Sequence, residues 1–541
     1  MEDLTGSENV YNDVLYPARC FPQTHPDRLA TVAYLRGLNP APVGHCRVLE
    51  LGCNAGVNLA PMAVEFPASD FVGVDLADKP IADGREFAAA LGLGNLHLQA
   101  RDLVTLSGVD LGQFDYVIAH GLYSWVPAPV RERILQLCQE LLAPEGVAYV
   151  SYNAYPGNHL RDLVRGMMRF HTAQFDGAPD RVGQARGLLK FVAESPRKPD
   201  YYHAAVKDQF ERLLKVSDPV VYHDDLSAHN QPFYFFQFMD DAARHGLRFV
   251  GEASANELAP QKYGQDVFRT LEVLEAANEI VREQYKDFVR GCAFRQTLLC
   301  RQERVLAPAP LAERVPRLYA LCDASEAEPR TVDPLRASVF RRQDGTVVET
   351  AHPLVSAAFA VLCSEYPGSV SFSDLLERAT ARMAGPEVTR PSDGPAGEAG
   401  ERTSEPGQVL QQALLRAHEA GFLFLHVQPH RVANRAGPRP AVSRLARFQL
   451  GRGELATNQL HRSIRFPDAL GRCLAQLLDG TRDRPALVAE LVRAVQEGGV
   501  PLLKNGSLVT GDGAVRALLF ERVDEGLVSL AREGMLVQEP G

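Results

Sequence analysis

No CxxC pair occurs among the nine cysteines, which are scattered along the 541-residue chain. Dispersed cysteines of this kind indicate reduced thiols and offer no zinc-binding spacing, so no metal site is predicted. No run approaches the roughly 18 consecutive apolar residues of a membrane span, and the acidic start lacks the basic and apolar segments of a secretory signal. These absences predict a cytoplasmic protein with no membrane partner.

Positive charge is also scarce. Lys and Arg number 57 against 67 Asp and Glu, which gives a net charge of −10 and a sequence pI near 5.9. A general nucleic-acid binder is usually basic, so nucleic acid is not an expected partner. Hydrophobic residues make up 45% of the chain, enough for a sizeable core, and the length predicts three or four domains.

Short apolar segments alternate with helical patterns in the first 150 residues. The helical patterns include Ile81–Leu91 and Val130–Leu142, where apolar residues recur on one face. This alternation predicts βαβ units and an α/β fold with a parallel sheet. The predicted strands, two later ones included, are Arg47–Leu51, Phe71–Val74, His97–Ala100, Phe114–Ala119, Val147–Tyr152, Leu247–Glu252 and Phe294–Cys300.

The rest of the chain predicts smaller modules. A helical lobe is expected between the fifth and sixth strands, Leu271–Val289 is expected as one helix, and Asp344-Gly345 is expected as the turn of a hairpin over Ser338–Thr350. Two weakly repeated helical patterns after Arg301 favour winged-helix-like α+β modules. The predicted domains are a core (1–156), the inserted helical lobe (157–221), a region that completes the seven-stranded sheet (222–303), and two winged-helix-like modules (331–430, with a disordered loop at 385–407, and 440–541).

The segment Glu50–Gly56 (ELGCNAG) lies on a strand-to-helix turn. Glycines there let the backbone approach a ligand, but one Gly-rich turn is also common in ordinary α/β folds. Asp75 ends the next strand, about where a carboxylate binds ribose hydroxyls in nucleotide sites. Asp102 ends the third strand, where a carboxylate can accept an adenine amine. Three acidic strand ends around one glycine turn favour a nucleoside-binding site.

The order VLELGCNAG, VGVDLA, ARDL and FDYVIAHG resembles the class I S-adenosylmethionine (SAM) dependent methyltransferases, which have a Rossmann-like seven-stranded sheet. The family has Gly where this chain has Asn54, the side chain best able to replace Gly in a left-handed turn. The resemblance assigns these residues to the cofactor: Glu50 near the methionine amino group, Gly52, Asn54 and Gly56 along methionine and ribose, Asp75 on the ribose, Asp102 and Leu103 at the adenine, and His120 in contact with the cofactor.

Longer motifs narrow the resemblance. They are FPQTHPDRLAT (21–31), HGLYSWVP (120–127), SYNAYPG (151–157), DDL (224–226) and FRQTLLC (294–300). Together they resemble bacterial methyltransferases with a methyltransferase regulatory domain, a group that includes the rickettsial protein lysine methyltransferases that modify outer-membrane proteins. This resemblance implies SAM as cofactor and a protein as the expected methyl acceptor.

The acceptor site is expected beyond strands four and five, where the candidate catalytic residues are His120, Tyr123, Trp125 and Tyr155. An aromatic wall suits an amine that becomes a methylated ammonium. His120 or Tyr155 could accept the lysine proton. Trp125 and His120 have a plainer interpretation as core and structural residues. Asn153-Ala154-Tyr155-Pro156 follows the fifth strand, whereas the Asn-Pro-Pro-Tyr motif follows the fourth, and its second position is Ala in place of Pro. Both differences disfavour amide or DNA-base methylation.

Two other functions remain open from the residues. The same domain could methylate a small molecule or a peptide product. Alternatively, the chain could be a SAM-binding regulator whose winged helices bind DNA, although Ala441–Gly541 carries nearly balanced charge and no clear basic face.

Overall fold

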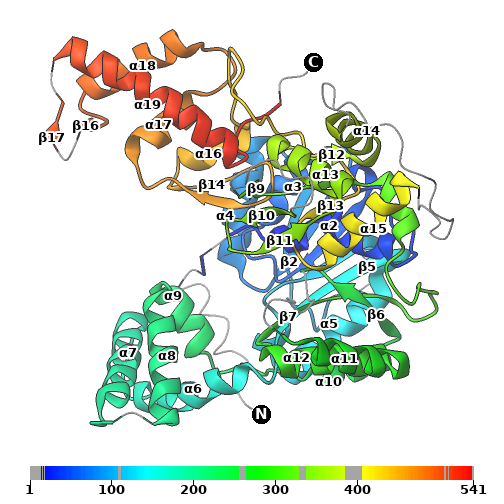
Figure 1. Ribbon diagram of the computed structural model, residues 1–541. Helices are drawn as coiled ribbons and strands as arrows, with labels where there is room; N and C mark the ends of the chain where they lie inside the picture. Colours follow the sequence, from blue (N-terminus) through cyan, green and yellow to red (C-terminus); the bar gives the residue numbers. More distant parts are fainter. Residues whose placement is uncertain are drawn as a thin grey trace, which may run out of the picture. The chain divides into compact units, whose positions relative to one another are not determined.

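The computed structural model describes residues 14, 16–17, 19–107, 111–198, 200–254, 263–327, 337–383, 405–504, 507–509 and 511–538. These residues form two compact units, and the first comprises residues 1–19 and 38–306. The second comprises Cys20–Gly37 and Ala307–Gly541. The second unit is therefore assembled from two segments that are far apart in the sequence, and its first segment, with helix α2 (Pro26–Leu35), interrupts the sequence of the first unit (Figure 1).

A seven-stranded sheet of order β3-β2-β1-β4-β5-β7-β6 is the centre of the first unit. The first five strands pair in parallel, and β7 is antiparallel to both of its neighbours. The expected Rossmann-like α/β fold is confirmed. The strands are β1 (Arg47–Leu51), β2 (Asp70–Asp75), β3 (Leu96–Ala100), β4 (Phe114–Ala119), β5 (Leu142–Asn153), β6 (Leu247–Glu252) and β7 (Phe294–Arg301).

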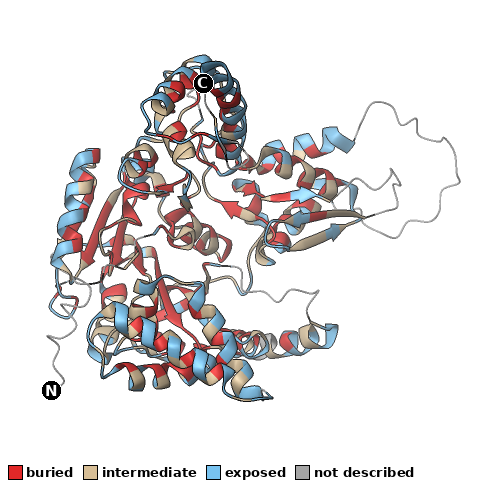
Figure 2. Ribbon diagram, turned by 90° about the vertical axis from the view of Figure 1, so that its left-hand side faces the viewer, coloured by how far each residue is buried: buried red, intermediate tan, exposed pale blue. Residues whose placement is uncertain are grey.

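Helices cover this sheet, and the strands in Figure 2 are accordingly drawn largely in red. Nearly every residue of β1 and β4 is buried, as in strands that are covered on both faces. The helices of this part are α3 (Leu59–Glu65), α4 (Asp78–Leu91), α5 (Ala128–Leu141), α10 (Phe235–Arg244), α11 (Gln265–Ala277) and α12 (Glu279–Arg290).

Two boundaries differ from the sequence prediction. The segment Leu271–Val289 does not form one helix, because Asn278 is extended and its side chain accepts the N–H of Ile280, which starts α12 afresh. Strand β5 begins at Leu142, not at Val147, because Phe114 pairs with Leu142 whereas Tyr116 pairs with Val147. The turn-like sequence Pro144-Glu145-Gly146 is thus an irregular part of the strand.

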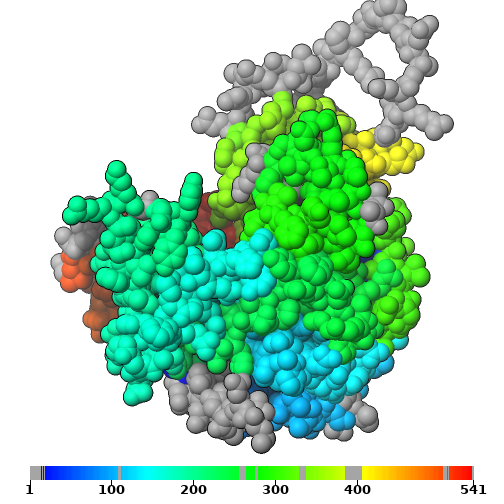
Figure 3. Space-filling view, turned by 90° about the horizontal axis from the view of Figure 1, so that it is seen from below, coloured from blue at the N-terminus to red at the C-terminus, as the bar shows by residue number. Residues whose placement is uncertain are grey.

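The predicted helical lobe follows β5. Its helices pack on one another around a small apolar core that includes Val164, Leu189 and Val206. In Figure 3 the lobe is the teal surface, continuous with the cyan residues that lead out of β5. Its elements are α6 (Asn158–Thr172), α7 (Ala178–Glu194), α8 (Tyr201–Leu214), α9 (Asp218–Val220) and the π-helix η6 (Val221–Asp225).

The second unit has two apolar cores. One core contains Leu35 of α2 together with residues of 315–425. The expected hairpin is present as β10 and β11, with Gly345 at φ +88° in its turn. The elements are η2 (Pro22–Thr24), α2 (Pro26–Leu35), η7 (Ala312–Arg317), β8 (Tyr319–Leu321), β9 (Ala324–Glu326), β10 (Ser338–Arg342), β11 (Val347–Thr350), α13 (Pro353–Glu365), β12 (Val370–Ser371), α14 (Phe372–Met383), α15 (Pro406–Glu419) and β13 (Phe424–His426).

The other core belongs to the last hundred residues, between Val442 and Leu536. Its elements are α16 (Arg444–Leu450), β14 (Leu455–Thr457), β15 (Ser463–Arg465), α17 (Ala469–Leu477), α18 (Arg484–Gln496), β16 (Leu503–Lys504), β17 (Ser507–Leu508) and α19 (Asp512–Arg532). The predicted disordered loop 385–407 lies outside the described residues except at its end, where Pro406 begins α15. Among the described helices, none has both the length and the apolar character that a bilayer span requires.

The segment Cys20–Gly37 precedes β1, and the predicted core domain 1–156 included it. It clusters instead with residues after Ala307. The sequence gives no signal of this, because an amphipathic helix before a strand does not reveal which apolar surface it covers.

Candidate active site

The loop after β1 has the backbone of a ligand-binding turn. Gly52, Asn54 and Gly56 have φ angles of +76°, +50° and +67°. A Cβ on Gly56 would lie 2.7 Å from Leu98, so glycine is required there. Asn54 tolerates its left-handed conformation, and its own Oδ1 accepts the Ala55 N–H at 2.6 Å. The loop therefore keeps its shape without the usual glycine.

Asp75 at the end of β2 holds this loop. Its Oδ2 accepts the Asn54 N–H at 2.7 Å and its Oδ1 accepts the Ala77 N–H at 3.0 Å. Burial raises the pKa of Asp75 from its ordinary value. Each carboxylate oxygen has a second lone pair, so Asp75 can still accept hydrogen bonds from a ligand.

Glu50 at the end of β1 is only 4% exposed. Its Oε1 accepts from Asn58 Nδ2 at 2.9 Å, whereas its Oε2 is buried with no hydrogen-bond partner among the described residues. Burial raises the pKa of Glu50 to about 8. A buried carboxyl with one open oxygen favours a cationic hydrogen-bond donor as ligand.

Asp102 follows β3, where its Oδ1 accepts the Val104 N–H at 2.9 Å and Leu103 is buried. Strands β3, β2 and β1 are neighbours in the sheet and run parallel. Asp102, Asp75 and Glu50 therefore follow one another along a single carboxyl edge, as the spacing predicts.

His120 follows β4. Its Nδ1 lies 2.9 Å from the hydroxyl of Tyr149 and 3.3 Å from that of Ser151, both on β5. Burial lowers the pKa of His120 to about 4, so its imidazole is neutral at neutral pH. A neutral imidazole can accept a proton, although this burial makes it a weak base.

Tyr123 does not face a substrate. It is 2% exposed and packs against Tyr152, Phe233 and Phe238 in the core of the sheet domain. Its hydroxyl donates to Asp241 at 3.4 Å. The prediction of a catalytic Tyr123 is therefore wrong, because the short helix η5 (Tyr123–Trp125) turns this side chain inward.

Trp125 is half-buried, and the Arg161 guanidinium lies 5.6 Å from the centre of its ring. Arg161 Nε donates to Asp225 at 2.8 Å, and the Asp225 side chain is fully buried. Trp125 thus stands beside α6 and η6, with one face occupied by a cation from the chain itself.

Tyr155 belongs to a cluster of rings. It stacks on His159, with ring centres 4.0 Å apart, and its ring lies 5.3 Å from that of Tyr234. The Tyr155 hydroxyl donates to Asp162 at 2.7 Å, and burial together with this carboxylate raises the pKa of Tyr155. A phenol with a raised pKa that already donates to a carboxylate is a poor proton acceptor, which disfavours that part of the sequence prediction.

Several residues of this cluster escaped the sequence analysis. Phe236 stacks on Tyr234, and Phe288 meets the same ring edge-on, while both remain more than 40% exposed. Asn230 Oδ1 accepts from Asn153 Nδ2 at 2.8 Å. The run Pro232–Phe238 (PFYFFQF) was the available signal, since so dense an aromatic run exceeds what one amphipathic helix buries.

Three family models match the chain. They are a methyltransferase domain over 48–146, a predicted methyltransferase regulatory domain over 217–301, and the C-terminal winged helix domain of PKMT over 438–535. The uncharacterized protein RP028 of Rickettsia prowazekii is 35% identical over 241 residues, which are 44% of this chain and 96% of RP028. The uncharacterized protein RP789 of the same bacterium is 28% identical over 521 residues, 94% of this chain and 90% of RP789.

Similarity to solved structures covers almost the whole chain. PKMT2 from Rickettsia typhi is 25% identical with a TM-score of 0.84, over 96% of this chain and 100% of that one. PKMT2 in complex with AdoHcy has a TM-score of 0.83 at the same identity and coverage.

The sheet order and the acidic strand ends, with these matches, define a class I SAM-dependent methyltransferase. The chain belongs to the family of these enzymes that carries a methyltransferase regulatory domain and a C-terminal winged helix domain. S-Adenosylmethionine is its cofactor. The resemblance stated from the motifs is confirmed.

Proposed function

We propose that this enzyme transfers methyl groups to lysine side chains of a protein. The observation that carries the proposal is the similarity to PKMT2, whose name denotes a protein lysine methyltransferase. It extends through the regulatory and winged-helix regions and is not confined to the SAM-binding core. A methyltransferase of small molecules would need only the SAM-binding core and a segment that closes its active site. We also infer that the enzyme works in the cytoplasm.

The proposed cofactor contacts follow from the free acceptors on the carboxyl edge. Glu50 Oε2 binds the methionine ammonium, and Asp75 accepts the ribose hydroxyls with its remaining lone pairs. Asp102 and Leu103 hold the adenine. Gly52 and Gly56 have no side chain, and the Asn54 side chain is bonded to the Ala55 N–H, so the backbone of this loop can lie against methionine and ribose.

The acceptor side is proposed at His120, Trp125 and Tyr155. SAM supplies an already activated methyl group, so this side must position a neutral amine in line and keep water out. The rings of Tyr155, His159 and Tyr234 desolvate the amine, which lowers the lysine pKa, and then face the methylated cation. The imidazole of His120 is neutral and can relay the released proton to water, but its lowered pKa means that it does not keep the proton.

The test is to trace the methyl group. The enzyme is incubated with methyl-labelled SAM and protein extract from its source. The labelled proteins are then hydrolysed to amino acids. We expect label in methylated lysine, and much less label with the Glu50→Gln variant when SAM is limiting. Label in a small-molecule fraction, in methylarginine or in nucleic acid would overturn the lysine assignment while leaving the methyltransferase itself intact.

A further inference from the structure

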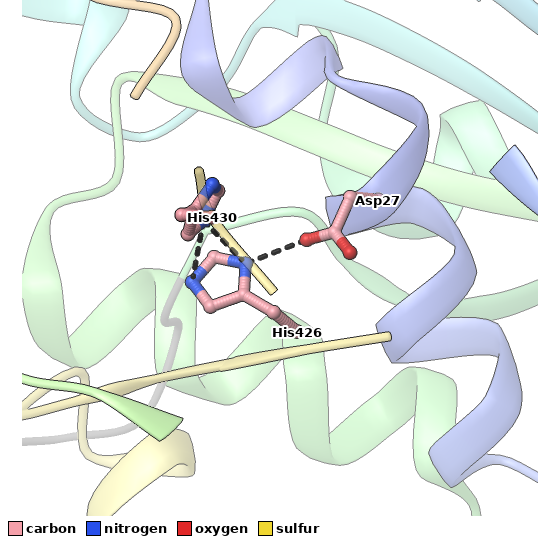
Figure 4. A group of neighbouring side chains, drawn as sticks. All are labelled: Asp27, His426 and His430. Atoms are coloured by element: carbon pink, nitrogen blue, oxygen red, sulfur yellow. Dashed lines mark hydrogen bonds and ion pairs between the residues drawn. The ribbon is translucent and has the colours of Figure 1, made fainter. Parts of the chain in front are cut away.

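A group of metal-ligating side chains, two of them buried and one half-buried, lies in the second unit, whereas the residues assigned to SAM belong to the first. Asp27 comes from the first turn of α2, His426 ends β13, and His430 follows four residues later. One ligand atom from each lies within 4.8 Å of the others. Figure 4 shows Asp27 reaching the ring of His426, with the ring of His430 nearly perpendicular to it.

Two backbone N–H groups fix the orientation of the Asp27 carboxylate. Asp27 Oδ1 accepts the backbone N–H groups of Val427 at 2.9 Å and Gln428 at 3.1 Å. These two bonds leave Oδ2 to face His426 Nδ1 at 2.5 Å. A ligating carboxylate is commonly fixed in this way by hydrogen bonds to its other oxygen.

The contact of His430 is a weak hydrogen bond. Its Nε2 lies 3.2 Å from Nδ1 and 3.4 Å from Nε2 of the His426 ring, and the ring planes are 76° apart. The lone-pair axes of the two nitrogens of an imidazole diverge in the ring plane, so an atom almost equidistant from both lies on neither axis. Among the described residues, His430 Nε2 therefore faces the Asp27–His426 pair without a well-directed partner.

We propose that Asp27, His426 and His430 bind a divalent transition-metal ion of the zinc class. Two imidazole nitrogens and a carboxylate oxygen are the ligands such an ion prefers. Zinc bonds of about 2.0–2.1 Å place tetrahedral ligand atoms about 3.3 Å apart, close to the 3.2 Å between the two histidine nitrogens. The ion displaces the proton held between Asp27 and His426 into solvent, and Oδ2 moves outward to admit it.

The ligands sit on anchored backbone. The His430 N–H donates to Ser369 Oγ at 3.0 Å, and His426 pairs with Tyr319 of β8. An ion at this position ties α2 to β13, two elements about 400 residues apart in sequence. Its role is therefore to fix the segment Cys20–Gly37 within the second unit, and methyl transfer does not pass through it.

The test is metal binding by the full-length protein. The purified chain is stripped with a chelator, given one equivalent of Zn²⁺, desalted and analysed for metal content. We expect about one ion per chain and a higher melting temperature than that of the stripped protein. Co²⁺ in place of Zn²⁺ should give the visible absorption of a tetrahedral site.

Two matched variants decide where the ion binds. His430→Gln removes one ligand and should weaken zinc affinity at least about tenfold, with loss of the melting shift. His45→Gln changes an exposed histidine of the first unit by the same substitution and should behave as the parent. If the protein retained no metal and its melting temperature did not change, the proposal would be overturned, and the three residues would only hold α2 against β13 by hydrogen bonds. Equal zinc affinity in the parent and in His430→Gln would also overturn it.

Discussion

Glu50 shows how a single residue couples cofactor binding to stability. Its carboxyl is fully enclosed, and one oxygen has no hydrogen-bond partner among the described residues. With a folded pKa of about 8, it is protonated in the free enzyme at neutral pH. An ammonium ligand would reverse this, because a nearby positive charge favours the carboxylate.

The first prediction concerns pH. Between the ordinary glutamate pKa and about 8, folded Glu50 holds a proton that the unfolded chain has lost, so the free energy of unfolding falls as pH rises, by at most about 1.4 kcal/mol per pH unit. Without SAM, Glu50→Gln should lack this slope and melt higher than the parent at pH 8–9, with little difference at pH 5. Its SAM affinity should drop about ten- to hundredfold. Thermal scans measure the stability of the parent and of the variant at each pH, and calorimetry measures their SAM affinities. If the stability of both proteins changed with pH in the same way, the raised pKa would not belong to Glu50.

The second prediction uses Trp125, the chain's one tryptophan, as a reporter. Arg161→Met removes the cation beside its ring and one partner of Asp225, so the tryptophan emission should change. Methyl transfer should fall about tenfold while SAM affinity stays within a few-fold, since the acceptor side alone is disturbed. Lys207→Met, on the exposed surface of α8, is the control. An equal loss of SAM affinity would mean that Arg161 supports the whole site.

The positions of the candidate site residues were predictable where the backbone sets them. Glu50, Asp75 and Asp102 lie at strand ends, and strand ends follow from the apolar pattern. The surroundings of Tyr123 and Tyr234 were not predictable. Helix η5 turns the Tyr123 side chain inward, and Tyr234, at the start of α10, meets Tyr155 from far along the chain. Which way a loop side chain points depends on contacts that sequence spacing does not encode.

At the scale of elements, helix α4 lies close to the cofactor loop because Gly84 has no side chain. A Cβ at Gly84 would lie 2.4 Å from the carbonyl oxygen of Ala55 and 2.7 Å from Leu98. The carbonyl belongs to backbone and cannot simply rotate away. The packing of α4 and the shape of the Gly52–Gly56 loop are therefore linked.

The third prediction tests this link. Gly84→Ala should destabilise the protein by about 1–3 kcal/mol and weaken SAM binding, because the loop must shift to admit the methyl group. The matched control is Gly183→Ala in α7, where nothing lies within 4 Å of the added Cβ. That change should stabilise by up to about 1 kcal/mol, since alanine favours helix. Thermal unfolding with and without SAM distinguishes them, and similar effects of both variants would refute the close packing.

The elements themselves were largely readable from the sequence. All seven strands of the sheet appear where apolar runs predicted them, because strands buried on both faces need such runs. The errors lie at Asn278 and at Pro144, where one side-chain bond and one irregular pairing decide the boundary. The spacing of apolar residues does not reveal such local interactions, so it does not predict these boundaries.

At the scale of the whole molecule, the first unit contains the complete sheet and every residue proposed to contact SAM. The second unit includes Cys20–Gly37, whose helix α2 has buried Leu29, Ala33 and Leu35. The sequence predicted a C-terminal winged-helix module, which a family model matches over 438–535, but not that Cys20–Gly37 belongs to the second unit.

The fourth prediction follows from that division. Residues 1–306, with Cys20–Gly37 replaced by a Gly-Ser linker of the same length, should fold and bind SAM, but should act poorly on a protein acceptor. Residues 1–306 with the natural segment should be less soluble, because α2 has lost its apolar partners. Gel filtration and calorimetry compare the two chains. Failure of the first chain to bind SAM would mean that the second unit is part of the catalytic fold.

The divided second unit also affects how the protein is made. Helix α2 leaves the ribosome early, but the imidazole of β13 and the backbone N–H groups just after it, which are the partners of Asp27, follow about 390 residues later. At roughly 5–20 residues per second, α2 waits about 20–80 s for them, long enough for the methyltransferase sheet to form first. A chaperone that binds nascent chains would therefore be expected to hold this amphipathic helix until translation is nearly complete.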